Sequence, residues 1–168
     1  ALHKGHISLI KESLKRCKKT IVSIYINPKQ FNKKSDFTKY PYNINKDISI
    51  LKKINVDFLF IPKTHEIYKE KRLKIVQLAK SQKILCAKYR KGHFEGVLDV
   101  MDRLTKIIKP KVIFMGEKDF QQIFLVKKFL LKRHKTRIFS CKTIRDKNFL
   151  ALSSRNYLLN KVQLKKAG

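Results

Sequence analysis

The sequence predicts an α/β protein of the doubly wound class, in which a parallel sheet is covered by helices on both faces. Short apolar runs of strand length alternate along the chain with longer segments whose apolar residues recur at helical spacing. The 168 residues suffice for one domain with a hydrophobic core and hardly for two. Ligands of such sheets bind at the carboxyl ends of the strands, so candidate functional residues are sought there.

Four apolar runs are the predicted strands of that sheet, and three segments of helical period are its main predicted helices. Asn27-Pro28 breaks the first strand, and Pro110 stops the longest helix. The strands are expected at 21–26, 57–61, 111–115 and 137–143. The helices are expected directly after the first six residues, at 96–108 and at 119–131.

The formal charge of +29 invites a nucleic-acid interpretation, because 41 Lys+Arg residues face only 12 Asp+Glu residues. Lysine supplies 33 of these basic residues and arginine only 8, although arginine is the better bidentate reader of phosphates and bases. The lysines are also spread along the whole chain rather than gathered in one stretch. This distribution favours a compositional bias over a specific nucleic-acid partner.

Three widely separated cysteines, Cys17, Cys86 and Cys141, exclude a self-contained disulfide framework and any CxxC metal or redox pair. We therefore expect a reducing, cytoplasmic location. No apolar run approaches the length of about 18 residues that a membrane span needs, so no membrane partner is expected.

The strongest short motif is a histidine pair at the entrance of the first helix. His3 and His6 are three residues apart, so both rings can face one point, and Gly5 lets a ligand approach the backbone closely. A helix N-terminus also favours an anion. The motif therefore predicts contacts with nucleotide phosphates, whereas the alternative is a pair of ordinary surface histidines at a frayed terminus.

Two further motifs follow predicted strands. Asn27 and Gln30 offer amide groups for a small polar substrate, although Asn-Pro alone is also explained as a turn. Gly116 permits a tight turn into the next helix, Lys118 can reach a phosphate, and Asp119 can cap that helix or bind a ribose or a metal. A capped helix with solvated charges is the alternative for this second motif.

A fourth motif, Ser153-Ser154-Arg155, comes after the last predicted strand. Its two hydroxyls and guanidinium, beside backbone amides, are suited to clamp a phosphate. The alternative is a Ser/Asn loop that ends the domain.

Seven motifs occur in one order along nearly the whole chain: LHKGH, SIYINPKQF, the Tyr40-Pro41 turn, VDFLFIP, RKGHFEGV, FMGEKDFQQ and IRDKNFLALSSRN. This set resembles the pantoate–β-alanine ligase family of the HIGH-type nucleotidyltransferase-like superfamily. The resemblance implies a Rossmann-like nucleotide-binding domain. It also implies a two-step reaction, in which pantoate and Mg-ATP form pantoyl adenylate and pyrophosphate, and β-alanine then releases pantothenate and AMP.

The resemblance also assigns roles to individual residues. The implied catalytic residues are His6, His3 and Lys118. The implied ATP-binding residues are Leu2, His3, Lys4, Gly5, His6, Gly116, Glu117, Lys118, Asp119, Ile144, Leu152, Ser153, Ser154 and Arg155. The residues implied for pantoate and β-alanine are Gln30, Gln122, Asn27, Arg90 and His93. Asp47 is a weaker candidate, as a ligand of Mg²⁺.

The family pattern further predicts how the chain is organised. Residues 1–158 are expected to form the nucleotide-binding ligase domain, whose first strand and Pro-Thr-Met-Gly turn would precede residue 1. Residues 159–168 are expected to begin a smaller C-terminal domain. Asn148-Phe149 stands where the family usually has Asp-Gly, and a phenylalanine does not readily adopt a positive φ, so this loop is expected to sit differently.

The leading interpretation is a cytoplasmic, homodimeric ligase with ATP, Mg²⁺, pantoate and β-alanine as ligands. A second is a non-catalytic fragment that keeps the fold, and a third is a related nucleotidyltransferase that uses another acid. A fourth, a basic nucleic-acid binder, predicts sequence-preferring and steeply salt-dependent binding to duplex DNA.

Overall fold

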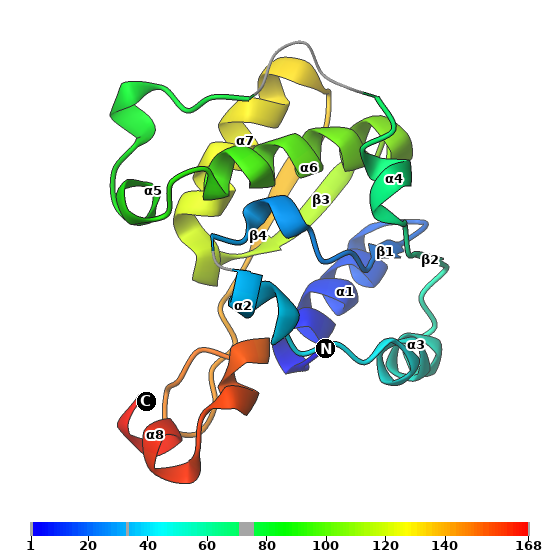
Figure 1. Cartoon of the computed structure of the whole chain (residues 1–168). Coiled ribbons are helices and arrows are strands. Elements are labelled where there is room, and N and C mark those ends of the chain that lie inside the picture. Colours follow the sequence, from blue (N-terminus) through cyan, green and yellow to red (C-terminus); the bar gives the residue numbers. More distant parts are fainter. Residues whose placement is uncertain (1, 33, 71–75, 168) are drawn as a thin grey trace.

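The computed structural model describes residues 2–32, 34–70 and 76–167. Short strands alternate with helices along the chain, as the sequence predicts (Figure 1). In chain order the elements are α1 (Lys4–Arg16), β1 (Ile21–Ser23), the 3₁₀ helix η1 (Pro28–Gln30), α2 (Lys34–Thr38), α3 (Ile44–Lys53), β2 (Phe58–Phe60), α4 (Thr64–Ile67), η2 (Lys80–Gln82), α5 (Cys86–Tyr89), α6 (His93–Ile108), β3 (Val112–Gly116), η3 (Glu117–Asp119), α7 (Phe120–Arg133), β4 (Arg137–Cys141), η4 (Ser154–Leu158) and α8 (Lys161–Lys166).

The strands form two parallel pairs, β1 with β2 and β3 with β4. In the second pair the register runs from Val112 opposite Arg137 to Gly116 opposite Cys141. The parallel arrangement confirms the predicted class. Within the described residues, however, the pairs are separate two-stranded sheets rather than one continuous sheet.

Helices cover both faces of the β3–β4 pair. Successive side chains of a strand point to opposite sides, so each strand contributes residues to both of these faces. Ile113, Met115 and Ile138 pack into the main hydrophobic core, which α6 and α7 complete with Val97, Leu98, Val126 and Leu130. On the opposite face Phe114 and Phe139 lie 5.2 Å apart, and the Arg16 guanidinium of α1 sits 4.4 Å from the Phe139 ring. The predicted two-sided covering is therefore present around these strands.

Several element boundaries differ from the predicted ones. The 21–26 strand is hydrogen-bonded as β-structure only over Ile21–Ser23, because the chain turns into η1 at Asn27-Pro28. The 96–108 helix begins three residues earlier, at His93, where Gly92 supplies a left-handed N-cap with φ +78. It ends at Ile108, before Pro110, as predicted.

The 145–151 segment accommodates Phe149 in the left-handed conformation, with φ 64. Asp146 organises this turn, since its Oδ1 accepts the backbone N–H groups of Asn148 at 2.8 Å and Leu150 at 3.1 Å. Arg145 and Ala151 close it as an antiparallel bridge. The turn thus keeps a positive φ at Phe149, a conformation that is unfavourable for this side chain.

The chain beyond this turn, with η4 and α8, extends away from the sheets (Figure 1). None of the described helices combines the length and apolar content needed to cross a bilayer.

Candidate functional site

A cavity of about 480 Å³ lies where the N-terminus of α1 meets the carboxyl ends of β3 and β4. This is the location that a doubly wound sheet predicts for a ligand. Most of the predicted site residues line it: His3, Gly5, His6, Gln30, Arg90, His93, Gly116, Lys118, Asp119, Gln122, Ile144, Leu152, Ser153, Ser154 and Arg155.

The two histidines of the helix entrance lie together, with ring centroids 3.9 Å apart. His3 is the N-cap of α1, and its Nδ1 accepts the backbone N–H of Gly5 at 3.1 Å. His6 Nδ1 in turn accepts the backbone N–H of His3 at 3.4 Å. Because each Nδ1 accepts a hydrogen bond, each neutral ring carries its proton on Nε2 and can donate it to a ligand.

Both imidazoles are neutral at physiological pH. Burial, and after it the neighbouring His3 ring, lowers the pKa of His6 to about 4, although Asp47 acts in the opposite direction. Burial, followed by the positive charge of Lys118, also lowers the pKa of His3. The pair therefore presents hydrogen-bond donors rather than positive charges.

Gly5 leaves room for this arrangement, because the His3 ring folds back over it. A Cβ at position 5 would lie 2.9 Å from His3 Cε1 and 3.0 Å from His3 Nδ1. The glycine of the HxGH motif thus makes room for the first histidine.

The segment after β3 brings a cation and amides to the cavity. Lys118 Nζ lies 2.9 Å from Asp119 Oδ1 in a partly exposed ion pair. Asp119 is the N-cap residue of α7 but makes no side-chain capping bond, so the predicted capping role is wrong. Gly116 has an ordinary extended conformation with φ −82, and the turn therefore does not depend on a glycine there.

Gln30 is held at the cavity by contacts between η1 and α6. His93 Nδ1 lies 2.7 Å from the Gln30 carbonyl oxygen. Burial lowers the pKa of His93, so the neutral ring donates Nδ1–H to this carbonyl. Gly96 permits the close packing, since a Cβ there would lie 2.5 Å from the Lys29 carbonyl oxygen.

Asn27 is buried outside the cavity lining, at 2% exposure. Its Nδ2 donates to the Gly96 carbonyl oxygen at 3.1 Å, and its Oδ1 accepts from Lys29 N–H and from the Tyr68 hydroxyl. The side chain therefore joins η1, α4 and α6, and its partners in the structure are protein groups rather than an open ligand site.

The loop after β4 closes the other side of the cavity. Ser153 caps η4 by accepting the backbone N–H of Arg155 at 3.3 Å. The Arg155 guanidinium makes a two-point contact with Asp36, from Nε at 3.3 Å and from Nη2 at 2.9 Å. It also lies 5.2 Å from the centre of the Tyr40 ring.

Leu2, Lys4 and Glu117 do not line the cavity, and neither does Asp47. Asp47 is 2% exposed, and its Oδ1 accepts the Leu2 backbone N–H at 2.7 Å. The described part of the chain contains no group of three or more His, Cys, Asp or Glu side chains that could hold a metal ion. The structure thus places the Asp47 carboxylate against the helix entrance.

Part of the lining was not predicted. Its members are mostly apolar or aromatic, and such residues cannot be told from core residues in a sequence. Lys142 and Thr143 directly follow β4, but the strand predicted at 137–143 is two residues longer than β4 and includes both of them. The unpredicted lining residues are Leu9, Phe31, Tyr40, Cys86, Phe94, Phe114, Met115, Phe120, Gln121, Lys142 and Thr143.

Comparison with known sequences gives a uniform result. The model of the family described as pantoate-beta-alanine ligase matches residues 1–168. Pantothenate synthetase of Azobacteroides pseudotrichonymphae is 42% identical over 170 residues, covering 100% of this chain and 61% of that protein. Pantothenate synthetase of Helicobacter acinonychis is 43% identical, covering 99% and 62%. The chain spans about three-fifths of the length of these curated relatives.

Solved structures agree with the sequence matches. A pantoate-beta-alanine ligase of Francisella tularensis, complexed with beta-gamma ATP and beta-alanine, superposes with a TM-score of 0.93 at 40% identity. The match covers 98% of this chain and 64% of that one. Pantothenate synthetase of Thermus thermophilus gives the same TM-score at 33% identity, covering 99% and 61%. These similarities establish the Rossmann-like fold predicted from the sequence.

Proposed function

The chain belongs to the pantoate–β-alanine ligase family, and we propose that its cavity serves the ATP-dependent condensation of pantoate with β-alanine. The products are pantothenate, AMP and pyrophosphate, and pantoyl adenylate is the intermediate. The complex of the Francisella tularensis relative with beta-gamma ATP and beta-alanine supports these two ligands.

One observation carries the proposal: a single cavity joins groups that are suited to bind phosphate with groups that are suited to bind a small acid. His3, His6 and Lys118 line it together with the amides of Gln30 and Gln122. The first three suit the phosphates of ATP, and the two amides suit the hydroxyl and carboxylate groups of pantoate. This combination is what a reaction between a carboxylate and ATP requires.

In the first step a pantoate carboxylate oxygen attacks the α-phosphorus of ATP, and the bond to the β-phosphate oxygen breaks to release pyrophosphate. The Nε2–H groups of His3 and His6 donate to phosphate oxygens, and these bonds strengthen as negative charge develops. Lys118 neutralises part of that charge. Positioning of the two anions supplies much of the rate.

In the second step the neutral amine of β-alanine attacks the acyl carbon of the adenylate. The C–N bond forms, the bond to the AMP oxygen breaks, and the nitrogen loses a proton. Arg90 and His93 line the same cavity as Gln30. We propose that Arg90 attracts a substrate carboxylate, whereas His93 acts on the substrate side mainly through the Gln30 backbone that it holds.

Mg²⁺ belongs to this proposal as part of the substrate, Mg-ATP. Among the described residues that line the cavity Asp119 is the one carboxylate, and it is paired with Lys118. Magnesium in nucleotide sites is held largely by phosphates and water. The donor set therefore fits an ion that arrives with ATP better than an ion caged by Asp47, which stays a sequence-based prediction.

The remaining proposals rest on the family. We propose that residues 1–158 form the nucleotide-binding domain, that the protein is a homodimer and that it works in the cytoplasm. Its three cysteines are free thiols, which is compatible with a reducing compartment. Light scattering on purified protein tests the dimer.

The experiment that tests the reaction is pyrophosphate release by this chain with ATP, Mg²⁺ and pantoate, with and without β-alanine. We expect pantoate-dependent release and AMP formation that β-alanine stimulates. Gln30→Ala and Gln122→Ala should each lower kcat/KM for pantoate about tenfold or more, because each removes hydrogen bonds to the acid. Gln163→Ala in α8, away from the cavity, is the matched control.

Two other outcomes decide against this proposal. Release that depends on a different acid, and that the two glutamine variants leave unchanged, would favour the related nucleotidyltransferase. A folded protein that releases no pyrophosphate with any of these substrates would favour the non-catalytic interpretation.

A further inference from the structure

Arg155 is held at the rim of the cavity by a residue that does not line it. The Asp36 carboxylate of α2 accepts from Nε and Nη2 of Arg155, at 3.3 and 2.9 Å. These two nitrogens form one edge of the planar guanidinium, which is the geometry of a two-point arginine–carboxylate pair. Asp36 itself is absent from the cavity lining, whereas Arg155 is part of it.

The contact leaves the remaining edge of the guanidinium to a ligand. Nη1 makes no hydrogen bond to any described residue, and the side chain is 46% exposed. Asp36 therefore occupies the edge formed by Nε and Nη2, and Nη1 is the nitrogen that stays available. A carboxylate in the path of the ligand would instead compete with phosphate for the same donors.

Aromatic rings anchor the α2 side of this contact. The Arg155 guanidinium stacks 5.2 Å from the Tyr40 ring centre, and Tyr40 packs edge-on against Phe31 at 5.7 Å. Phe31 also meets Phe37 of α2 at 5.4 Å. Phe31 directly follows Gln30. These ring contacts therefore connect Arg155, which we propose to bind the nucleotide, with Gln30, which we propose to bind pantoate.

We propose that Asp36 is a positioning residue for the nucleotide, which aligns Arg155 over the cavity and fastens the η4 loop to the α2 segment. This inference rests on the proposed function for the identity of the ligand. The pair spans 119 residues of sequence, so it joins two otherwise separate segments. ATP affinity then depends on a carboxylate that ATP does not touch.

The test is a double-mutant cycle in ATP binding, measured by calorimetry on the wild-type chain, Asp36→Asn, Arg155→Gln and the double variant. Asp36→Asn should weaken ATP binding roughly threefold to tenfold, the range for a partly exposed pair with a ring contact. Adding it to Arg155→Gln should cause no further loss. Glu12→Gln, which breaks the exposed Glu12–Arg16 pair away from the cavity, should leave the affinity unchanged.

Tighter ATP binding by Asp36→Asn would overturn the proposal, because Asp36 would then be a competitor of phosphate. Unchanged affinity, or losses that simply add in the double variant, would overturn it as well. Circular dichroism of each variant confirms that it is folded.

Backbone hydrogen exchange on the same four proteins makes the result independent of the proposed function. The amides of Asn156 and Leu159 are bonded within the η4 loop. Both should exchange faster in Asp36→Asn and in Arg155→Gln, and no faster in the double variant. If the wild-type chain binds no ATP, the proposed function fails, and non-additive exchange still supports the positioning contact while additive or unchanged exchange refutes it.

Discussion

His3 and His6 are neutral hydrogen-bond donors because the local backbone occupies one nitrogen of each ring. The N–H groups of Gly5 and His3 donate to the two Nδ1 atoms, which fixes the proton of each ring on Nε2. A protonated ring could not accept these bonds, so protonation would break the helix entrance as well as introduce a buried charge. The motif is suited to donate to phosphate without itself changing protonation state.

This arrangement predicts an acid-sensitive contribution of His6 to stability. The pKa of His6 is about 4 in the folded chain and about 6.5 when unfolded, so the unfolded state binds the proton more tightly. The free energy of unfolding should therefore fall as the pH drops from about 6.5 to about 4, by up to about 3 kcal/mol. Above about pH 6.5 this ring is neutral in both states, so the free energy of unfolding no longer depends on pH through His6.

Urea unfolding followed by circular dichroism between pH 4 and 7 measures this contribution. His6→Gln should flatten the pH dependence relative to the wild-type chain, whereas the same change at the exposed His65 should not. An identical slope in wild type and His6→Gln would contradict the assignment. Comparing the two proteins cancels carboxylates that titrate in the same range.

Single residues also mark where sequence reasoning stops. The spacing of His3 and His6 identifies a site because both rings must face one point near the helix entrance. Asn27 follows a predicted strand and was also a candidate, yet its amide is hydrogen-bonded to Gly96, Lys29 and Tyr68. Those partners are up to 69 residues away in sequence. Only tertiary packing decides whether such a side chain faces a ligand or the core.

At the scale of elements, the turn between Arg145 and Ala151 holds Phe149 in a conformation that suits glycine. Its φ is 64 and the residue is 78% exposed, so burial of the ring stabilises the fold little and does not offset the backbone strain. Phe149→Gly should stabilise the chain by about 0.5–1 kcal/mol. The variant removes the cost of the left-handed conformation, and the greater conformational entropy of glycine in the unfolded chain offsets part of that gain. Chemical denaturation measures the change.

Asn148→Gly is the matched control for this turn, because Asn148 does not have a positive φ. It should lower the stability by a few tenths to about 1 kcal/mol through the unfolded state alone. A destabilised Phe149→Gly variant would show that the phenylalanine makes a favourable contact that outweighs its backbone strain.

The packing of η1 on α6 makes Gly96 a sensitive position. A Cβ at residue 96 would lie 2.5 Å from the Lys29 carbonyl oxygen and 3.2 Å from the Gln30 nitrogen, and both are backbone atoms that cannot rotate away. Gly96→Ala should therefore destabilise the fold by about 2 kcal/mol or more and displace Gln30. Thermal unfolding, together with the KM for pantoate, measures the two effects.

Gly116→Ala is the comparison for folding stability. A Cβ there would meet only the Leu9 Cδ2 atom, at 4.0 Å, so its free energy of unfolding should change by no more than about 0.5 kcal/mol. Equal stability of the two alanine variants would disprove the proposed close packing at Gly96.

The order and type of the main elements were predictable, whereas the length of β1 and the division of the strands into two separate pairs were not. Short apolar runs predict β3 and β4, and apolar residues at helical spacing predict α7, in each case to within two residues at either end. The apolar run at 21–26 exceeds β1 because Tyr25 and Ile26 lie beyond the ladder that Ile24 N–H closes on Phe60. Hydrogen-bond pairing depends on the neighbouring strand, and composition carries no information about where that neighbour ends.

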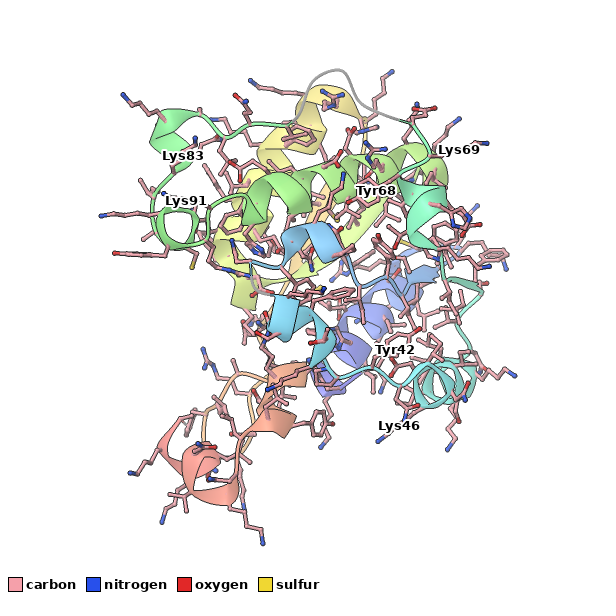
Figure 2. All side chains as sticks on the ribbon, in the orientation of Figure 1. Tyr42, Lys46, Tyr68, Lys69, Lys83 and Lys91 are labelled. Atoms are coloured by element: carbon pink, nitrogen blue, oxygen red, sulfur yellow. The ribbon has the colours of Figure 1, made fainter. Side chains whose placement is uncertain are left out.

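Across the whole molecule, lysines lie on most of the helical elements and on the segments between them. Figure 2 shows Lys83 and Lys91 near each other on one side of the molecule, and Lys69 and Lys46 apart from them and from each other on the other side. They belong to or follow four different helical elements: α3, α4, η2 and α5. The distribution agrees with the compositional interpretation of the lysines, and it makes mutual repulsion a property of the entire folded chain.

That repulsion predicts that salt stabilises the fold. Several of the described ion pairs are exposed, such as Lys106–Glu70 and Lys118–Asp119, and each of these contributes about 0–1 kcal/mol. They cannot offset a formal charge of +29 concentrated by folding. Raising NaCl from about 0.05 to about 0.5 M screens the repulsion and should raise the unfolding midpoint by roughly 3–6 °C.

Anion binding in the cavity could raise the midpoint too, and Arg155→Gln separates the two causes. General screening acts on all the charges, so removing one of them should leave the salt-dependent increase nearly intact. Chloride bound in the cavity would depend on Arg155, and the variant would then lose much of the increase. A midpoint that falls with added salt would mean that local ion pairs outweigh the repulsion, and the lysines would have to be organised around specific acidic partners within the fold.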